Sequence, residues 1–171
     1  MNETLMNIMA RRSIRRYTEE PVCESTMKLV LAAACAAPSA KGERPVRFVV
    51  LDKKRMGSLA EKVQQKDPFR EGQWAIAVLA DLRGYDSGLA WIEDGAAAME
   101  NMQIACKSLG LGSLWYGVYR RAAKEAAVRE FLQLPDGVEV LGITVMGYAA
   151  ERKEASSGVG ESKVRYGIWS E

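Results

Sequence analysis

The sequence predicts a single domain built from both helices and strands. The chain has 171 residues, a length typical of one domain, and a chain of this size buries roughly 70% of its unfolded surface on folding. Two short apolar runs, residues 48–51 and 74–80, are typical of buried strands. The segments around them place apolar residues at helical spacing, and the longest such segment begins at Trp91.

The composition is that of an ordinary soluble protein. Hydrophobic residues make up 48% and charged residues 27% of the chain, and the net charge is +2. This balance favours neither nucleic acid nor a membrane surface as a partner. The sequence has no signal peptide and no apolar run long enough to span a bilayer. Cys23, Cys35 and Cys106 are widely spaced, without a CxxC pair, so we expect buried thiols in a reducing cytoplasm.

The chain contains no histidine. A Ser-His-Asp triad, a Cys-His dyad and a His-ligated zinc site are therefore excluded. We assign no side chain as a catalytic acid, base or nucleophile and expect no metal. Any chemistry must come from other residues or from a cofactor.

The first half of the chain is predicted to alternate helices and strands. The predicted elements are helices over residues 3–12 and 24–36, a strand over 48–51, a helix over 53–66 and a strand over 74–80. The strand 48–51 is solidly apolar, so we expect it at the centre of a sheet. Asp67 and Pro68 are expected to close the helix that precedes them.

The second half begins with the long helix from Trp91, which Gly110 and Gly112 end. The predicted elements that follow are a strand over 114–118, a helix over 122–132 and a strand over 138–148. A polar, glycine-rich flexible linker is predicted over residues 151–162. It leads to an apolar and aromatic tail, residues 163–171, which must dock either on its own sheet or on that of a partner.

The long helix carries apolar residues on more than one side. Its apolar side consists of Gly95, Ala98, Met99, Met102, Ala105, Cys106 and Leu109. Asp94 and Gln103 fall on the opposite, polar side, but Ala97 and Ile104 lie in the middle of that side. The helix is either an ordinary core helix or one buried first by its own domain and then by a second subunit.

Four arginines within six residues form a concentrated positive site. Arg11, Arg12, Arg15 and Arg16 surround Ser13, which adds a hydroxyl donor. A phosphate is the favoured ligand, because guanidinium groups bind phosphate oxygens in pairs. The alternatives are a solvated basic turn or a nucleic-acid patch, and the second would need a more basic chain. Lys163 and Arg165 could close on the same anion.

Two further stretches could approach a flat ligand. The loop from Pro38 to Pro45 has a proline at each end and small residues between them. Residues Leu114–Gly117, Leu-Trp-Tyr-Gly, combine aromatic rings with a glycine. An ordinary connection and an ordinary core strand are the simpler interpretations of these two stretches. The chain has neither a GxGxxG nor a GxxxxGK[ST] motif, so neither a Rossmann site nor a P-loop is indicated.

Taken together, these segments resemble the nitroreductase family of flavoproteins. Five blocks occur in the family's order and cover nearly the whole chain. They are residues 11–17 (RRSIRRY), 37–45 (APSAKGERP), the helix block 91–117, 140–148 (VLGITVMGY) and the ending 163–169 (KVRYGIW).

The resemblance implies an α+β fold of three layers, α/β/α, with a mixed and mainly antiparallel sheet. It further implies one domain over residues 1–171, acting as an obligate homodimer with the long helix at its core. The tail would reach across and dock on the partner subunit. Two FMN molecules would bind, one at each end of the dimer interface.

The resemblance also implies the roles of the site residues. Arg11, Arg12, Ser13 and Arg15 would contact the phosphate, ribityl chain and pyrimidine edge of FMN, and Lys163 and Arg165 would complete the phosphate site. Pro38, Ser39 and Ala40 of the other subunit would line the flavin ring. Its opposite side would face Leu114, Trp115, Tyr116 and Gly117, with a backbone N–H near N5.

The chain departs from the family in one loop. Where the family usually has Asn-x-Gln-Pro-Trp, this sequence has Gly42-Glu43-Arg44-Pro45-Val46. The Asn and Gln contacts to the flavin or ribityl chain are therefore absent, and Arg44 could supply a replacement donor beside Gly42.

The activity implied by the family is a ping-pong reaction. Hydride would pass from NADH or NADPH to flavin N5, and two electrons would then pass to a nitroaromatic, a quinone or a similar small-molecule acceptor. Arg15 would stabilise the reduced, anionic flavin. Two other readings remain open, which are a flavin-binding or sensing protein with little turnover and a relative that removes halogen or fragments flavin.

Overall fold

The computed structural model of the chain describes residues 1–85, 90–156, 160 and 163–169. Its helices are α1 (Glu3–Ala10), α2 (Glu24–Cys35), α3 (Lys53–Ala60), α4 (Asp67–Glu71), α5 (Trp91–Ser108) and α6 (Ala122–Leu132), with a 3-10 turn η1 (Ala40–Gly42). Its strands are β1 (Val46–Leu51), β2 (Trp74–Asp81), β3 (Gly112–Gly117) and β4 (Val138–Gly147). Residues 157–159 and 161–162 of the predicted linker and residues 170–171 of the tail lie outside the described part. Within that part, no helix is both long and apolar enough to cross a membrane.

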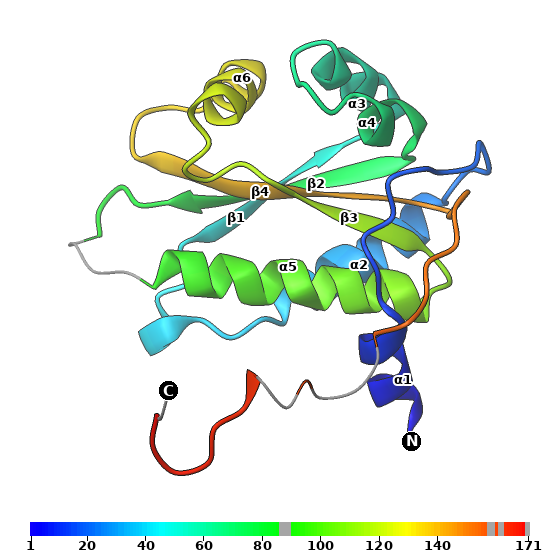
Figure 1. Cartoon of the computed structure of the whole chain (residues 1–171). Helices are drawn as coiled ribbons and strands as arrows, with labels where there is room; N and C mark the ends of the chain where they lie inside the picture. The colour runs from blue at the N-terminus through cyan, green and yellow to red at the C-terminus, as the bar shows by residue number, and fades with distance from the viewer. Residues whose placement is uncertain (86–89, 157–159, 161–162, 170–171) are drawn as a thin grey trace.

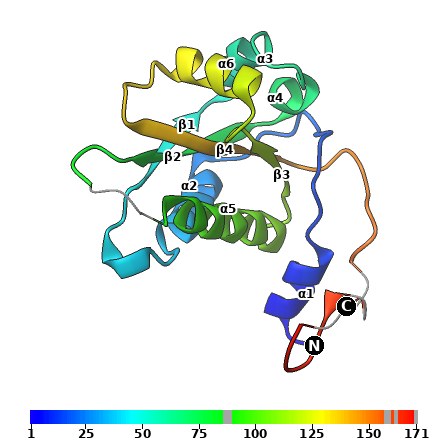
Figure 2. The same cartoon turned by 60° about the vertical axis from the view of Figure 1, so that its left-hand side comes forward.

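The strands form one sheet between two helical layers. The sheet has four strands in the order β1-β2-β4-β3, and every neighbouring pair is antiparallel. Helices α3, α4 and α6 cover one face, and α2 and α5 cover the other (Figures 1 and 2). A separate hydrophobic cluster fills the space on each side of the sheet. The predicted three-layer α+β fold is confirmed.

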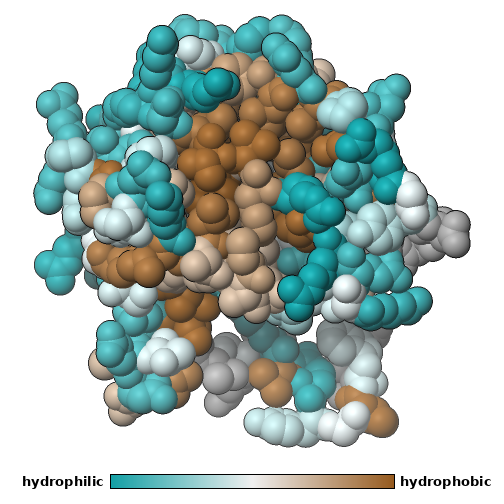
Figure 3. Space-filling model, turned by 180° about the vertical axis from the view of Figure 1, so that it is seen from behind, coloured by the Kyte–Doolittle hydropathy of each residue, from teal (hydrophilic) through white to brown (hydrophobic). Residues whose placement is uncertain are grey.

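Strand β1 lies at an edge of the sheet and not at its centre, contrary to the prediction for residues 48–51. Its sequence is apolar for a different reason: its side chains pack on the hydrophobic clusters on both faces of the sheet. Val49 packs on the cluster beneath α3 and α4, whereas Phe48 and Val50 pack on the cluster beside α2. Figure 3 views the molecule from the side on which β1 lies and shows a broad hydrophobic area bordered by hydrophilic groups.

The predicted helix over 53–66 is shorter than expected. It begins at its N-cap Asp52, which accepts a hydrogen bond from the Arg55 N–H, and α3 ends at Ala60. Asp67 and Pro68 do not close this helix but begin α4. Proline favours the first turn of a helix because its missing N–H would have no intrahelical partner there. Helix α4 buries Pro68 and Phe69.

Helix α1 ends at Ala10, two residues before the predicted end. Its cap Arg11 already has an extended conformation, with φ −60° and ψ 131°. The arginines that follow are therefore extended chain and not the last turn of a helix. No residue of α1 is buried, and Leu5 and Met6 are each 50% exposed.

Helix α5 matches the predicted long helix, but its polar side is partly buried. Gly95, Ala98, Met99, Met102 and Cys106 are buried as predicted. Asp94 and Gln103 are buried as well, which the sequence pattern did not indicate. Gln103 accepts a hydrogen bond from the Ser113 hydroxyl (2.8 Å), and this bond joins α5 to β3. Ala97 and Ile104 are half-buried in the single chain.

The cysteines differ from the expectation of buried thiols. Cys106 is buried, but Cys23 and Cys35 are exposed, and all of them are free thiols. Cys23 is exposed because it caps the start of α2, where the chain enters from a surface turn. Hydrogen bonds from Ser25 and Thr26 lower the pKa of Cys23 to about 7.

Gly142 allows β3 and β4 to lie close together. A Cβ atom at this position would lie 2.8 Å from the Tyr116 carbonyl oxygen and 3.1 Å from Nε1 of Trp115. We expect Gly142→Ala to lower the free energy of unfolding by about 2 kcal/mol through overpacking. Gly57→Ala is the matched control in urea denaturation, because its Cβ would meet nothing within 4 Å. Gly57→Ala should stabilise by about 0.5 kcal/mol, and equal effects of the two variants would contradict the prediction.

Candidate functional site

The arginine segment, residues Arg11–Arg16, enters the sheet beside β3. The Ile14 N–H donates to the Ser113 carbonyl (2.8 Å), and Ser13 forms an isolated parallel bridge with Ser113. Beyond the segment, the Thr18 N–H donates to the Tyr148 carbonyl (2.9 Å). The segment therefore runs between the start of β3 and the residues that follow β4.

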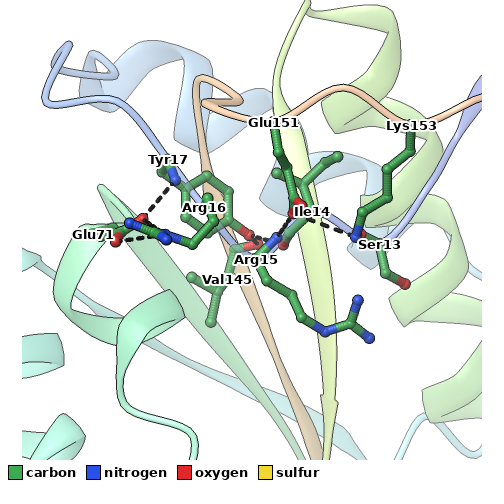
Figure 4. A network of polar contacts seen from close by, with 9 residues as sticks. All are labelled: Ser13, Ile14, Arg15, Arg16, Tyr17, Glu71, Val145, Glu151 and Lys153. Carbon is green, nitrogen blue, oxygen red and sulfur yellow. Dashed lines mark hydrogen bonds and ion pairs between the residues drawn. The ribbon is translucent and has the colours of Figure 1, made fainter.

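Charged side chains from elsewhere in the chain hold the backbone of this segment (Figure 4). Glu71 of α4 accepts hydrogen bonds from the Tyr17 N–H (2.9 Å) and from Nε of Arg16 (2.8 Å). Glu151 accepts from the Arg15 N–H, and Nζ of Lys153 donates to the Ser13 carbonyl (2.6 Å). Hydrogen bonds from Arg16 and from the Arg15 N–H lower the pKa values of Glu71 and Glu151, respectively.

Tyr17 fixes the segment from the core side. Its hydroxyl donates to the Ile14 carbonyl (2.7 Å) and also lies 3.2 Å from the Val145 carbonyl oxygen. The side chain is buried, and this burial raises the pKa of its hydroxyl. The phenol therefore acts as a neutral donor that ties the segment to β4.

Three hollows adjoin the arginine segment. One, of about 340 Å³, has a positively charged lining formed by Arg11, Arg12, Ser13, Arg15 and Lys153. A larger hollow of about 520 Å³ extends from Arg11 and Arg12 to Lys107 near the end of α5. A third, of about 430 Å³, lies between Arg15 and residues 64–68. Arg15 thus borders two of the hollows.

The arginines of the segment differ in their partners. Arg11 pairs with Glu100 of α5 (3.1 Å), and Arg16 pairs with Glu71 (2.8 Å). Among the described residues, neither Arg12 nor Arg15 forms an ion pair through its side chain. Their guanidinium groups remain available to an anion.

The loop Pro38–Pro45 is held by Asp94 in the first turn of α5. The Ser39 hydroxyl donates to one carboxylate oxygen of Asp94 (2.6 Å), and the Ala40 N–H donates to the other (2.9 Å). The Arg44 N–H donates to the Ser39 hydroxyl oxygen (2.8 Å). Asp94 is only 7% exposed, so its charge is compensated by these contacts in a buried setting.

The same loop borders a small hollow and contains left-handed residues. The hollow, of about 160 Å³, is lined by Pro38, Ser39 and Arg44 together with Asp94. Gly42 has φ 71°, and Arg44 has φ 51°. The left-handed conformation at Arg44 is uncommon for a residue with a side chain.

The loop Pro38–Pro45 and the large hollow beside the arginines reach opposite ends of α5. Asp94, which holds the loop, is in the first turn, whereas that hollow reaches Lys107 in the last turn. Thirteen residues of helix correspond to about 20 Å. The hollow beside Pro38, Ser39 and Arg44 shares no lining residue with the three hollows beside the arginine segment.

Strand β3 presents its backbone and not its side chains. Leu114 and Tyr116 are buried at 2% and 1% exposure, and Trp115 is half-buried. Because β3 is an edge strand, the outer edge of Leu114–Gly117 has no strand partner within the described chain. At its far end, a Cβ atom on Gly117 would lie 2.3 Å from Nη1 of Arg121, so that guanidinium rests against the Gly117 backbone.

Comparison with known proteins identifies the family. A model of the nitroreductase family matches residues 8–85 and 65–148. The chain belongs to the nitroreductase family. This confirms the resemblance drawn from the five sequence blocks.

Individual family members are similar over nearly their whole length. A protein of Archaeoglobus fulgidus, provisionally named NADH dehydrogenase/NAD(P)H nitroreductase, is 35% identical over 157 residues, which span 90% of each chain. The structure of an FMN-dependent nitroreductase from Clostridium difficile R20291 matches with a TM-score of 0.85 at 31% identity, over 96% of this chain and 99% of the other. A provisionally named nitroreductase from Desulfovibrio desulfuricans, solved in complex with FMN, matches with a TM-score of 0.84 at 27% identity, over 99% of each chain.

The loop Gly42–Val46 of this nitroreductase-family protein departs from the family's usual sequence. Gly42, which stands where the family usually has Asn, has a left-handed conformation. Asparagine and glycine are the residues that adopt this conformation most readily, so the replacement preserves the turn. It removes the side-chain amide, however, and the Arg44 guanidinium forms no hydrogen bond or ion pair with another described residue in this subunit that would replace it.

The tail lies apart from the hollows in this nitroreductase-family chain. Lys163 and Arg165 are exposed and do not line the hollows beside the arginines. The Arg165 guanidinium lies 5.7 Å from the centre of the Trp169 ring, and Trp169 is 80% exposed. Figures 1 and 2 show the tail away from the sheet.

Sequence reasoning missed the lysine that does line the site. Lys153 borders both the 340 Å³ and the 520 Å³ hollow, and it contacts Ser13 directly. Its position six residues after the end of β4 was the available signal. An antiparallel neighbour of β3 brings the residues after its end to the start of β3, where Ser13 also lies.

Proposed function

We propose that this protein is an FMN-dependent oxidoreductase that works as a homodimer. It would take hydride from NADH or NADPH and pass two electrons to a small acceptor such as a nitroaromatic or a quinone, by a ping-pong mechanism. When bound, the flavin supplies the redox chemistry, with hydride accepted at N5. The chain's own residues bind the cofactor, orient it and set its electrostatic surroundings.

The observation that carries this proposal is the positive hollow beside β3. Arg12 and Arg15 border it without a carboxylate partner among the residues that the structure describes, and Lys153 and the Ser13 hydroxyl lie with them. Guanidinium forks and an ammonium group suit the oxygens of a phosphate monoester, such as that of FMN. The site therefore fits a phosphate-bearing cofactor by the chemistry of its donors.

The open edge of β3 suits the flavin ring. Backbone N–H groups along Leu114–Gly117 can approach a flat ligand without intervening side chains, because Leu114 and Tyr116 point into the core. Arg15 stands between the phosphate hollow and the third hollow, so one residue could reach both the ribityl chain and the pyrimidine edge. Positive charge there would stabilise a reduced, anionic flavin.

The homodimer is supported by surfaces that one subunit leaves uncovered. Ala97 and Ile104 of α5 are half-buried, and Leu5, Met6 and Ile8 of α1 are between 42% and 50% exposed. The tail residues Tyr166, Ile168 and Trp169 are between 80% and 94% exposed. Apolar surface of this extent favours association, and the hydrophobic area beside β1 is a suitable place for a partner's tail (Figure 3).

A dimer would also bring together the separated parts of the site. The loop Pro38–Arg44 is held at the first turn of α5, about 20 Å along the helix from Lys107, which lines the large hollow beside the arginines. A twofold axis across the middle of α5 would place this loop beside the arginine segment of the partner. Pro38, Ser39 and Ala40 would then line the flavin held by the other subunit, and Lys163 and Arg165 would reach the phosphate from the docked tail.

The absorbance spectrum of the purified protein tests the proposal. We expect the yellow absorbance of bound flavin, bleaching by NADH or NADPH without oxygen, and recovery on adding a nitroaromatic or a quinone. A colourless protein that stays colourless after FMN is added would overturn the proposal. Bound flavin that neither nicotinamide bleaches would instead favour a flavin-binding or sensing protein, for which the altered loop at Gly42 and Arg44 is the supporting feature.

A further inference from the structure

Two carboxylates lie within a site whose proposed ligand is an anion. Glu71 and Glu151 both contact the arginine segment, and each adds negative charge where positive charge would favour binding (Figure 4). Electrostatics alone would therefore disfavour both residues at this place. Their contacts indicate another role.

We infer that Glu71 and Glu151 are positioning residues, which hold the backbone of the arginine segment so that Arg12 and Arg15 face the phosphate of the bound cofactor. The inference rests on the proposed function, because it takes a phosphate-bearing flavin as the ligand. Neither carboxylate is expected to touch the flavin.

The contacts of Glu71 are those of a clamp. One of its oxygens accepts from both the Tyr17 N–H (2.9 Å) and Nε of Arg16 (3.0 Å), while the other accepts from Arg16 (2.8 Å). The backbone at Glu71 is itself fixed, because Nζ of Lys53 donates to the carbonyls of Glu71 (2.8 Å) and Gly72 (2.9 Å). An ordinary surface ion pair would hold only the Arg16 side chain.

Glu151 holds the backbone at Arg15, two residues before the Tyr17 N–H that Glu71 holds. It accepts from the Arg15 N–H and pairs with Lys153 (3.3 Å), whose ammonium group donates to the Ser13 carbonyl (2.6 Å). The backbone is thus held by side chains at Ser13, Arg15 and Tyr17. In Figure 4, no dashed line joins the Arg15 guanidinium to any other residue drawn.

Preorganisation explains why the carboxylates are useful in an anion site. A segment already fixed in its binding conformation loses little conformational freedom when the ligand arrives. Without the contacts of Glu71 and Glu151, the arginine segment would become ordered only when the ligand binds, and this loss of conformational entropy would weaken binding.

The two roles predict opposite signs for one substitution. Glu71→Ala removes a negative charge and frees Arg16, so a purely electrostatic role predicts tighter FMN binding. A positioning role predicts weaker binding, because alanine offers no acceptor to the Tyr17 N–H or to Arg16. The same reasoning holds for Glu151→Ala and the Arg15 N–H.

The test measures dissociation constants for FMN and for riboflavin, which lacks the phosphate, by quenching of flavin fluorescence. We expect FMN affinity to fall about tenfold in Glu71→Ala and in Glu151→Ala, and riboflavin affinity to fall much less. Glu61→Ala is the control, since Glu61 pairs with Arg70 (2.8 Å) and does not contact the arginine segment. Unchanged or tighter FMN binding in both variants would overturn the inference.

A second measurement keeps this inference separate from the proposed function. Hydrogen exchange of the Arg15 and Tyr17 amides should accelerate in Glu151→Ala and Glu71→Ala, respectively, even without a ligand. If the wild-type protein binds neither flavin, the proposed function fails, whereas faster exchange would still show the clamp. Unchanged exchange at both amides would show that the carboxylates do not hold the segment.

Discussion

Replacing Arg11 and Arg15 together by alanine is expected to yield a protein that purifies mostly without flavin. Both guanidinium groups border the same hollow, of about 340 Å³. A hydrogen bond to a charged group contributes roughly 1.5–3 kcal/mol, so the loss of two should weaken FMN binding by roughly 10² to 10⁴-fold. The ratio of flavin to protein absorbance after purification measures the effect directly.

The double variant Lys54→Ala with Arg55→Ala is the matched control. It also removes two positive charges, but from exposed positions on α3, and neither residue lines the hollows beside the arginines. Flavin content should remain at the wild-type level in this control. Full flavin occupancy in the Arg11 and Arg15 variant would show that the cofactor site lies elsewhere.

Periodicity predicted most of the elements because burial on one or both sides leaves a local pattern. The strands β2 and β4 and the helices α2 and α6 lie within a residue or two of the predicted ranges. The strand at 48–51 was assigned the wrong place for a physical reason. An apolar run indicates that the side chains of a strand pack on hydrophobic clusters on both faces of a sheet. An edge strand such as β1 can do so as well as a central strand.

The site could be predicted only in part. The arginine segment is a local cluster, so spacing alone indicated an anion site. Lys153, Glu71 and Glu151 join it from positions between 54 and 140 residues away, through contacts that only the folded chain creates. A single sequence contains no periodic signal for such contacts. The family resemblance did not supply them either, since its motifs describe the ligand side of the site.

Asp94 illustrates the same limit within a helix. The sequence places Asp94 on the polar side of α5, but the residue is only 7% exposed. The chain after α2 folds over the start of α5 and brings Ser39 and Ala40 to this carboxylate. A polar residue on a polar face can thus be buried by a loop, which helical periodicity does not register.

Asp94→Ala is accordingly expected to lower the free energy of unfolding by about 3 kcal/mol. The substitution removes acceptors from the Ser39 hydroxyl (2.6 Å) and the Ala40 N–H (2.9 Å) and leaves both donors in a partly buried loop. Each hydrogen bond to a charged group contributes roughly 1.5–3 kcal/mol. Urea denaturation at a fixed protomer concentration measures the change, since association would otherwise alter the apparent stability.

Glu93→Ala provides the comparison, because Glu93 is the adjacent acidic residue in the same turn of α5 and is exposed. It should change the stability by less than about 0.5 kcal/mol. Asp94→Asn should fall between the two, as the amide keeps one acceptor oxygen. If Asp94→Ala were no more destabilising than Glu93→Ala, the carboxylate would not be what holds the loop. Under the proposed dimer, the released loop would belong to the flavin site of the partner, so Asp94→Ala should also weaken FMN binding while leaving the arginine segment intact.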